Sequence, residues 1–138
     1  MDDCGMLVQV EAVGQVADGR ATVRVRSEVG ATTAFWCGDP TGVGREHHVE
    51  WTVDEDVAWG GNTRPAILFS PGVAEVEGDR IAFRGRLGLT GDGGAVLDVA
   101  GTRILFDLAD PPPSPAVDGT WVEVRVERNS VSVWPYLL

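Results

Sequence analysis

Short stretches in which apolar and polar side chains alternate run along most of the chain. In one of them, Val23 and Val25 alternate with Thr22, Arg24 and Arg26. Successive side chains of an extended strand point to opposite faces, so we expect one face of this segment to be buried and the arginines to face solvent. No long stretch repeats apolar residues every three to four positions, as an amphipathic helix would. The pattern therefore predicts an all-β protein.

The same order of strands and turns occurs twice along the chain. The turn Asp18-Gly19 aligns with Asp92-Gly93, and Asp39-Pro40 aligns with Asp110-Pro111. An Asp-Gly pair suits a tight hairpin because Gly adopts positive φ, and Pro ends strand pairing because it has no N–H group. The spacing of these turns indicates an internal duplication.

Each repeat is expected to contain five short strands, three in a meander followed by a longer connection and a final hairpin. This order matches the small Greek-key barrels, of which the OB-fold is the commonest example. The sequence predicts two tandem, homologous five-stranded OB-like barrels related by a pseudo-twofold axis. A single larger barrel or sandwich that draws strands from both repeats is the alternative. The first repeat covers residues 1–60, the connecting segment residues 61–78 and the second repeat residues 79–138.

The strands follow from this pattern. Besides the strand that contains Val23 and Val25, we expect strands at residues 6–13, 31–37, 48–53 and 57–60 of the first repeat, and at residues 80–89, 94–100, 102–108, 120–127 and 130–135 of the second. Between the repeats, the run Ala66-Ile67-Leu68-Phe69 is too apolar for a solvated tether. We expect it to pack against a barrel or to add an edge strand.

The net charge of −10 makes some classes of binding partner unlikely. Residues 1–60 hold four arginines against eleven acidic residues, so the first repeat is the more acidic. Nucleic-acid binding draws much of its affinity from basic groups that displace counterions, so this charge makes nucleic acid an unlikely partner. The same charge repels anionic membranes, and no apolar run is long enough to span a bilayer. With an acidic amino terminus and only Cys4 and Cys37 as cysteines, we expect a cytoplasmic protein without a disulfide framework.

The segment from Trp36 to His48 concentrates the groups that carry chemistry. Cys37, His47 and His48 are the candidate metal ligands. Structural zinc sites place paired Cys or His on both sides of a loop, whereas here one side has a single Cys and the two adjacent imidazoles diverge in an extended segment. Cys37 as a nucleophile with His47 or His48 as its base would be the enzymatic interpretation, but nothing in the spacing secures a base within hydrogen-bond reach or a third group to orient it. The sequence predicts no catalysis, no metal and no cofactor.

Two tryptophans have no aromatic counterpart in the other repeat. Trp36 aligns with Asp107 and Trp121 with His48, and unpaired aromatics at strand ends are able to form a binding surface. Closing the interface between the repeats is the structural alternative for both. The candidate binding residues are Trp36, Cys37, Asp39, Arg45, His47, His48 and Trp121.

Two resemblances bear on function. Cys37-Gly38-Asp39-Pro40 with Val43-Gly44 and Val49-Glu50-Trp51 resembles the pattern of an uncharacterised family of small proteins from high-GC Gram-positive bacteria. That resemblance implies no particular activity. The duplicated architecture is also similar to the molybdate-binding proteins built from two OB-type barrels, although their oxyanion-binding end segments have no counterpart here.

The function that the sequence favours is that of a non-enzymatic protein-interaction module with another protein as its partner, and homo-oligomers are possible. The alternatives are a small-ligand, oxyanion or metal-binding protein that uses the segment from Trp36 to His48, and an OB-type single-stranded nucleic-acid binder, which the acidity disfavours.

Overall fold

The computed structural model describes residues 6–17, 20–39 and 43–136. These residues form eleven strands, all in one continuous sheet, and two short 3-10 helices, so the all-β prediction is confirmed. The turn predicted at Asp18-Gly19 lies outside the described residues, as does Cys4.

The strands are β1 (Met6–Ala17), β2 (Arg20–Ser27), β3 (Gly30–Trp36), β4 (Glu46–Val53), β5 (Thr63–Pro65), β6 (Gly72–Val76), β7 (Arg80–Leu89), β8 (Gly94–Val99), β9 (Thr102–Asp107), β10 (Trp121–Glu127) and β11 (Val131–Pro135), and the 3-10 helices are η2 (Pro115–Val117) and η3 (Arg128–Ser130).

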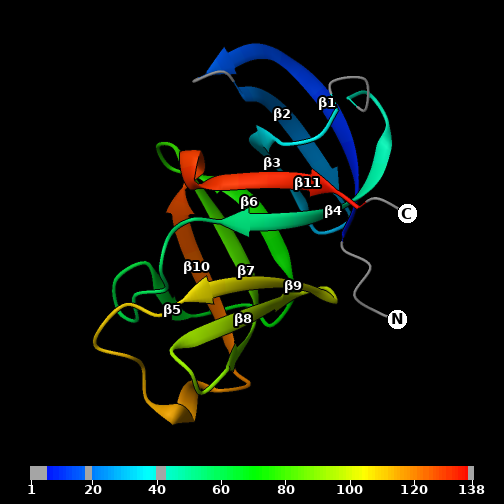
Figure 1. Ribbon diagram of the computed structural model, residues 1–138. Coiled ribbons are helices and arrows are strands. Elements are labelled where there is room, and N and C mark those ends of the chain that lie inside the picture. The colour runs from blue at the N-terminus through cyan, green and yellow to red at the C-terminus, as the bar shows by residue number, and fades with distance from the viewer. Residues whose placement is uncertain (1–5, 18–19, 40–42, 137–138) are drawn as a thin grey trace.

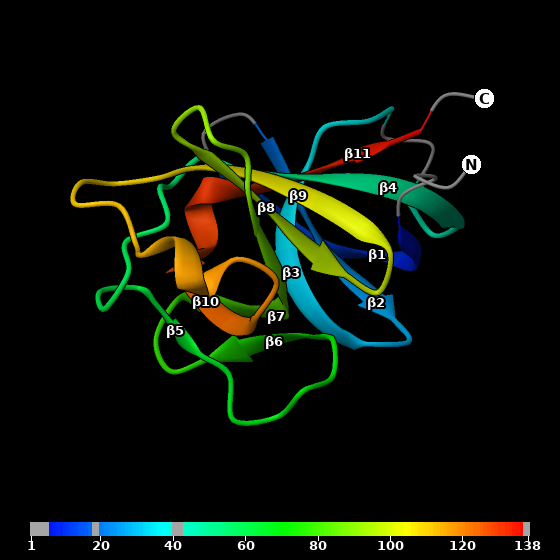
Figure 2. The same ribbon diagram turned by 90° about the horizontal axis from the view of Figure 1, so that it is seen from below.

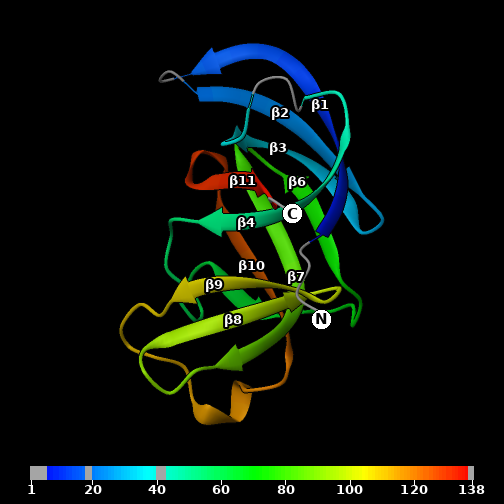
Figure 3. The same cartoon turned by 45° about the vertical axis from the view of Figure 1, so that its right-hand side comes forward.

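Five of the strands close into a small mixed barrel. β1 pairs antiparallel with β2 and with β4, and β2 pairs antiparallel with β3. β11 completes the circuit because it is antiparallel to β4 and parallel to β3 (Figures 1 and 3). One five-stranded barrel is therefore present, and the remaining six strands extend the sheet beyond it.

The strand that closes this barrel is not the one expected. Residues 57–60 were predicted to be the fifth strand of the first repeat, but they form only isolated bridges, at Val57 and Trp59. β11, from the far end of the chain, lies in that position and buries Val131 and Val133 completely. The prediction for residues 57–60 is wrong because a local pattern does not say which segment pairs with the strands of the barrel, and β11 is the segment that pairs with β3 and β4.

The other six strands form a second group joined to the barrel through β3. β7 is its central strand and pairs with β6, β8 and β10, while β8 continues to β9 and β10 to β5. β6 runs parallel to β3 and pairs Val73 with Gly30. A Cβ atom on Gly30 would lie 1.8 Å from the carbonyl oxygen of Val73, and Gly30 has a φ of 140°, so only glycine fits at this junction.

A single hydrophobic core runs through both groups of strands. Inward positions of every long strand contribute to it, mostly as valine. Trp51 of β4 and Phe83 of β7 meet edge to face across the two groups, with ring centroids 5.5 Å apart. Trp51 is buried as the sequence predicted, and within the described residues its indole nitrogen has no hydrogen-bond partner. Because the core is shared, neither group buries its apolar face alone.

The connecting segment differs from the prediction. Ala66 is buried, but Ile67, Leu68 and Phe69 form no edge strand and lie exposed in the loop between β5 and β6, where Phe69 stacks on Trp121 of β10. Two strands of this region, β5 and β6, were not predicted. Figure 2 shows the β5–β6 loop projecting from the molecule.

Candidate functional site

The first residue of the segment from Trp36 to His48 has a structural role. Trp36 is buried, and its indole Nε1 donates a hydrogen bond of 3.0 Å to the carbonyl oxygen of Asp39. The imidazole of His47 lies beside the same indole, with ring centroids 5.3 Å apart. Trp36 therefore anchors the start of the loop to β4, while the side chain of Asp39 is exposed. Residues 40–42 of the predicted site lie outside the described residues.

The other candidate ligands do not converge. Cys37 is a half-buried free thiol whose backbone N–H donates to Val133 of β11. His47 is half-buried, whereas His48 is exposed on the opposite face of β4, as expected for neighbours in a strand. Arg45 is exposed and its carbonyl accepts from Val10. Within residues 6–17, 20–39 and 43–136, no three His, Cys, Asp or Glu side chains are grouped closely enough to hold a metal ion.

The packing of Trp36 gives a stability prediction. Trp36→Phe removes the hydrogen bond to Asp39 and part of the buried ring, so we expect the free energy of unfolding to fall by about 1–2 kcal/mol. The matched control is Trp134→Phe, because Trp134 is 47% exposed and should change stability by less than about 0.5 kcal/mol. Urea denaturation followed by circular dichroism measures both. Equal effects would show that Trp36 does not anchor the loop.

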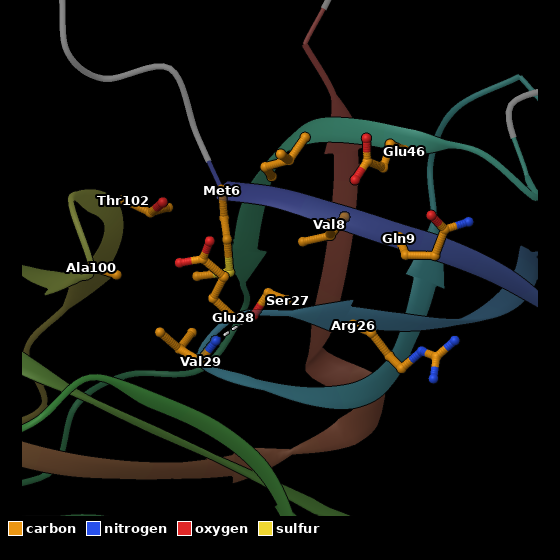
Figure 4. Close-up of a pocket in the computed structure, with 11 residues that line it drawn as sticks. Met6, Val8, Gln9, Arg26, Ser27, Glu28, Val29, Glu46, Ala100 and Thr102 are labelled. Carbon is orange, nitrogen blue, oxygen red and sulfur yellow. Dashed lines mark hydrogen bonds between the residues drawn. The ribbon is translucent and has the colours of Figure 1, made fainter.

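A pocket of about 450 Å³ lies where the barrel meets the β8–β9 turn. Met6 and Glu28 line it, as do Ala100 and Thr102 from the region of the turn (Figure 4). Among the described residues that line it, Arg26 is the one cation, and its guanidinium is paired with Glu11. Since Glu28 and Glu46 also line the pocket, its charge is unsuited to an oxyanion.

The most unusual surface is the β5–β6 loop, residues 66–71. Ile67 is 95% exposed, Leu68 60% and Phe69 73%. Isolated apolar residues on a protein surface are ordinary, but three large ones in succession form a contiguous patch that water solvates poorly. We refer to Ile67, Leu68 and Phe69, together with the Trp121 ring on which Phe69 stacks, as the apolar patch.

Contacts at both ends fix this loop. The backbone N–H of Ala66 donates to the carbonyl of Trp121 at 3.0 Å, and Arg84 Nε donates to the carbonyl of Ser70 at 2.7 Å. Gly72 makes room for the arginine, since a Cβ atom there would lie 2.7 Å from a guanidinium nitrogen. The Phe69 ring stacks on Trp121 with centroids 6.4 Å apart and planes inclined by 12°. Specific contacts thus hold the loop to β7 and β10.

Of the predicted binding residues, the structure places Trp121 in the apolar patch. Trp36, Asp39 and His47 lie together at the loop they were predicted to form, and Trp121 belongs to β10. Sequence reasoning missed Ile67, Leu68 and Phe69 as surface residues. The available signal was the apolar run itself, flanked by turn-forming residues, but the same run is typical of a buried segment.

Comparison with protein-family models, with curated proteins and with solved structures finds no match to this chain. Within its described part, the chain has no helix of the length and apolar character that crossing a bilayer requires.

Proposed function

We propose that this chain is a non-enzymatic protein-interaction module and that the apolar patch is its contact surface. The observation that carries the proposal is the exposure of three consecutive large apolar side chains on a loop fixed at both ends. Contiguous exposed apolar surface of this kind marks interaction sites in monomeric proteins. Aromatic rings near the centre of an interface carry a large share of its binding energy, and Phe69 stacked on Trp121 supplies two of them.

Energetics support an intermolecular role for the patch. Burying a side chain the size of Ile, Leu or Phe gains about 1.5–3 kcal/mol, and folding of this chain leaves that gain unrealised at Ile67, Leu68 and Phe69. The loop is held in place by Ala66 and Arg84, so ordering it on binding costs little conformational entropy. The patch is therefore preorganised for binding a partner.

We also infer that the second group of strands is a divergent barrel related to the first by an exchange of fifth strands. The pairings β7–β8, β8–β9 and β7–β10 repeat the pairings β1–β2, β2–β3 and β1–β4. Val57 is parallel to Leu108 just after β9, and β5 is antiparallel to β10, as β11 is parallel to β3 and antiparallel to β4. This arrangement supports two OB-like units in which each lends the other its last segment.

Site-specific photo-crosslinking tests the proposed function. A photoreactive amino acid at position 67 of the full chain, in lysate of the native cells, should give one dominant crosslinked protein that mass spectrometry identifies. The matched control carries the same amino acid at Leu7, which is 48% exposed on β1 of the barrel. We expect the adduct at position 67 alone, and excess unlabelled wild-type chain should compete it away. The same adducts from both positions, or none from position 67, would refute the proposal.

A further inference from the structure

We infer that the apolar patch binds an acidic protein segment that also carries apolar side chains. The inference rests on the proposed function and adds the chemical class of the partner. It is drawn from the charges around the patch, which are opposite in sign to those of the chain as a whole.

Arginines surround the patch on the exposed face of the sheet. Arg86 lies directly opposite Trp121 in the β7–β10 pair, and Arg84 and Arg64 lie on either side of Glu123, two residues further along β10. Directly opposed residues of neighbouring strands share a face, as do residues two apart in one strand. Three guanidinium groups thus belong to the same face as the Phe69–Trp121 stack.

This basic face has a net positive charge. The row of Trp121 and Arg86 continues to Asp98 and Arg103, and Arg125 is the next residue of β10 on this face after Glu123. The face thus comprises five arginines and the two carboxylates of Glu123 and Asp98. The Glu123 carboxylate is ion-paired within the face, since its Oε2 lies 2.7 Å from Nε of Arg125 and 3.7 Å from Nη2 of Arg64. Because the chain as a whole has a net charge of −10, it repels a negatively charged partner except at this face.

The composition of the patch favours protein over nucleic acid. A base stacks on aromatic rings, but Ile67 and Leu68 are aliphatic and are the parts of the patch that a nucleic acid would cover least well. A polynucleotide also carries its charge along its whole length, so it would run from the basic face onto the acidic remainder of the surface. A short segment that alternates acidic and apolar side chains meets both the arginines and the patch.

The test is selection of peptides of about twelve residues from a random library on the immobilised full chain. We expect the enriched peptides to be rich in Asp and Glu with Leu, Ile or aromatic residues. The affinity of the chain for these peptides, measured by fluorescence polarisation, should fall about tenfold in the double variant Arg64→Ala and Arg86→Ala. Raised salt should lower the affinity further, because it screens the attraction between arginines and acidic side chains. The control Arg24→Ala, on β2 of the barrel, should change it less than about twofold.

Each other outcome has a distinct meaning. Peptides that lose affinity in Leu68→Asp but carry no excess of acid, and ignore the double variant, would overturn the acidic partner and leave the proposed function standing. Peptides indifferent to Leu68→Asp would overturn both. A single-stranded oligo-dT that binds and competes with the peptides would replace the protein segment by a nucleic acid.

Discussion

Replacing Val133 by Asp is expected to abolish cooperative folding of the entire chain. Val133 is completely buried in β11, the strand that closes the barrel between β3 and β4. A carboxylate at this position enters the core without a partner, at a cost of at least about 5 kcal/mol, which is comparable to the whole stability of a domain. Because one core is shared by both groups of strands, the damage should not stay local.

The neighbouring residue provides the control. Ser132 lies on the same strand with its side chain on the outer face, so Ser132→Asp should leave a cooperative transition with a free energy of unfolding within about 1 kcal/mol of the wild type. Thermal unfolding monitored by circular dichroism and tryptophan fluorescence distinguishes the two variants. If Val133→Asp kept a native-like second transition, the two groups of strands would be independent domains.

Replacing Leu68 by Asp is expected to weaken partner binding strongly without a cost in stability. Leu68 is 60% exposed, so the folded chain gains little from it and the free energy of unfolding should change by less than about 0.5 kcal/mol. In the complex the same residue would sit at the centre of the apolar patch, where truncation of an anchor costs about 2 kcal/mol or more. The new carboxylate would in addition repel an acidic partner. We therefore expect the dissociation constant to rise at least about thirtyfold.

Local pattern was sufficient to predict most of the strands. Alternation of apolar and polar residues is a local property, and the strands predicted from residues 80–89 and 31–37 are found as β7 and β3 to within a residue. What the pattern could not give is the partner of each strand. β11 was predicted as a strand in its correct place, yet its pairing with β3 and β4 joins residues that are far apart in the chain.

The candidate site shows the same division. The divergence of His47 and His48 followed from strand geometry and is confirmed. The exposure of Ile67 could not be predicted from the sequence. Hydrophobicity gives the free energy gained when a side chain is buried, but it does not say whether the fold offers a surface on which that side chain packs. In this fold Ile67, Leu68 and Phe69 are not part of the core, and Arg84 ties their loop to the outer face of β7.

The most direct test of the apolar patch as the contact surface compares Leu68→Asp with Leu7→Asp, on β1 of the barrel. Both variants introduce the same carboxylate in place of a leucine of similar exposure, but only Leu68 belongs to the patch. The measurement is the dissociation constant, by isothermal titration calorimetry, for the protein crosslinked at position 67. We predict a rise of at least about thirtyfold for Leu68→Asp and less than about twofold for Leu7→Asp. Equal dissociation constants for the two variants would contradict the account.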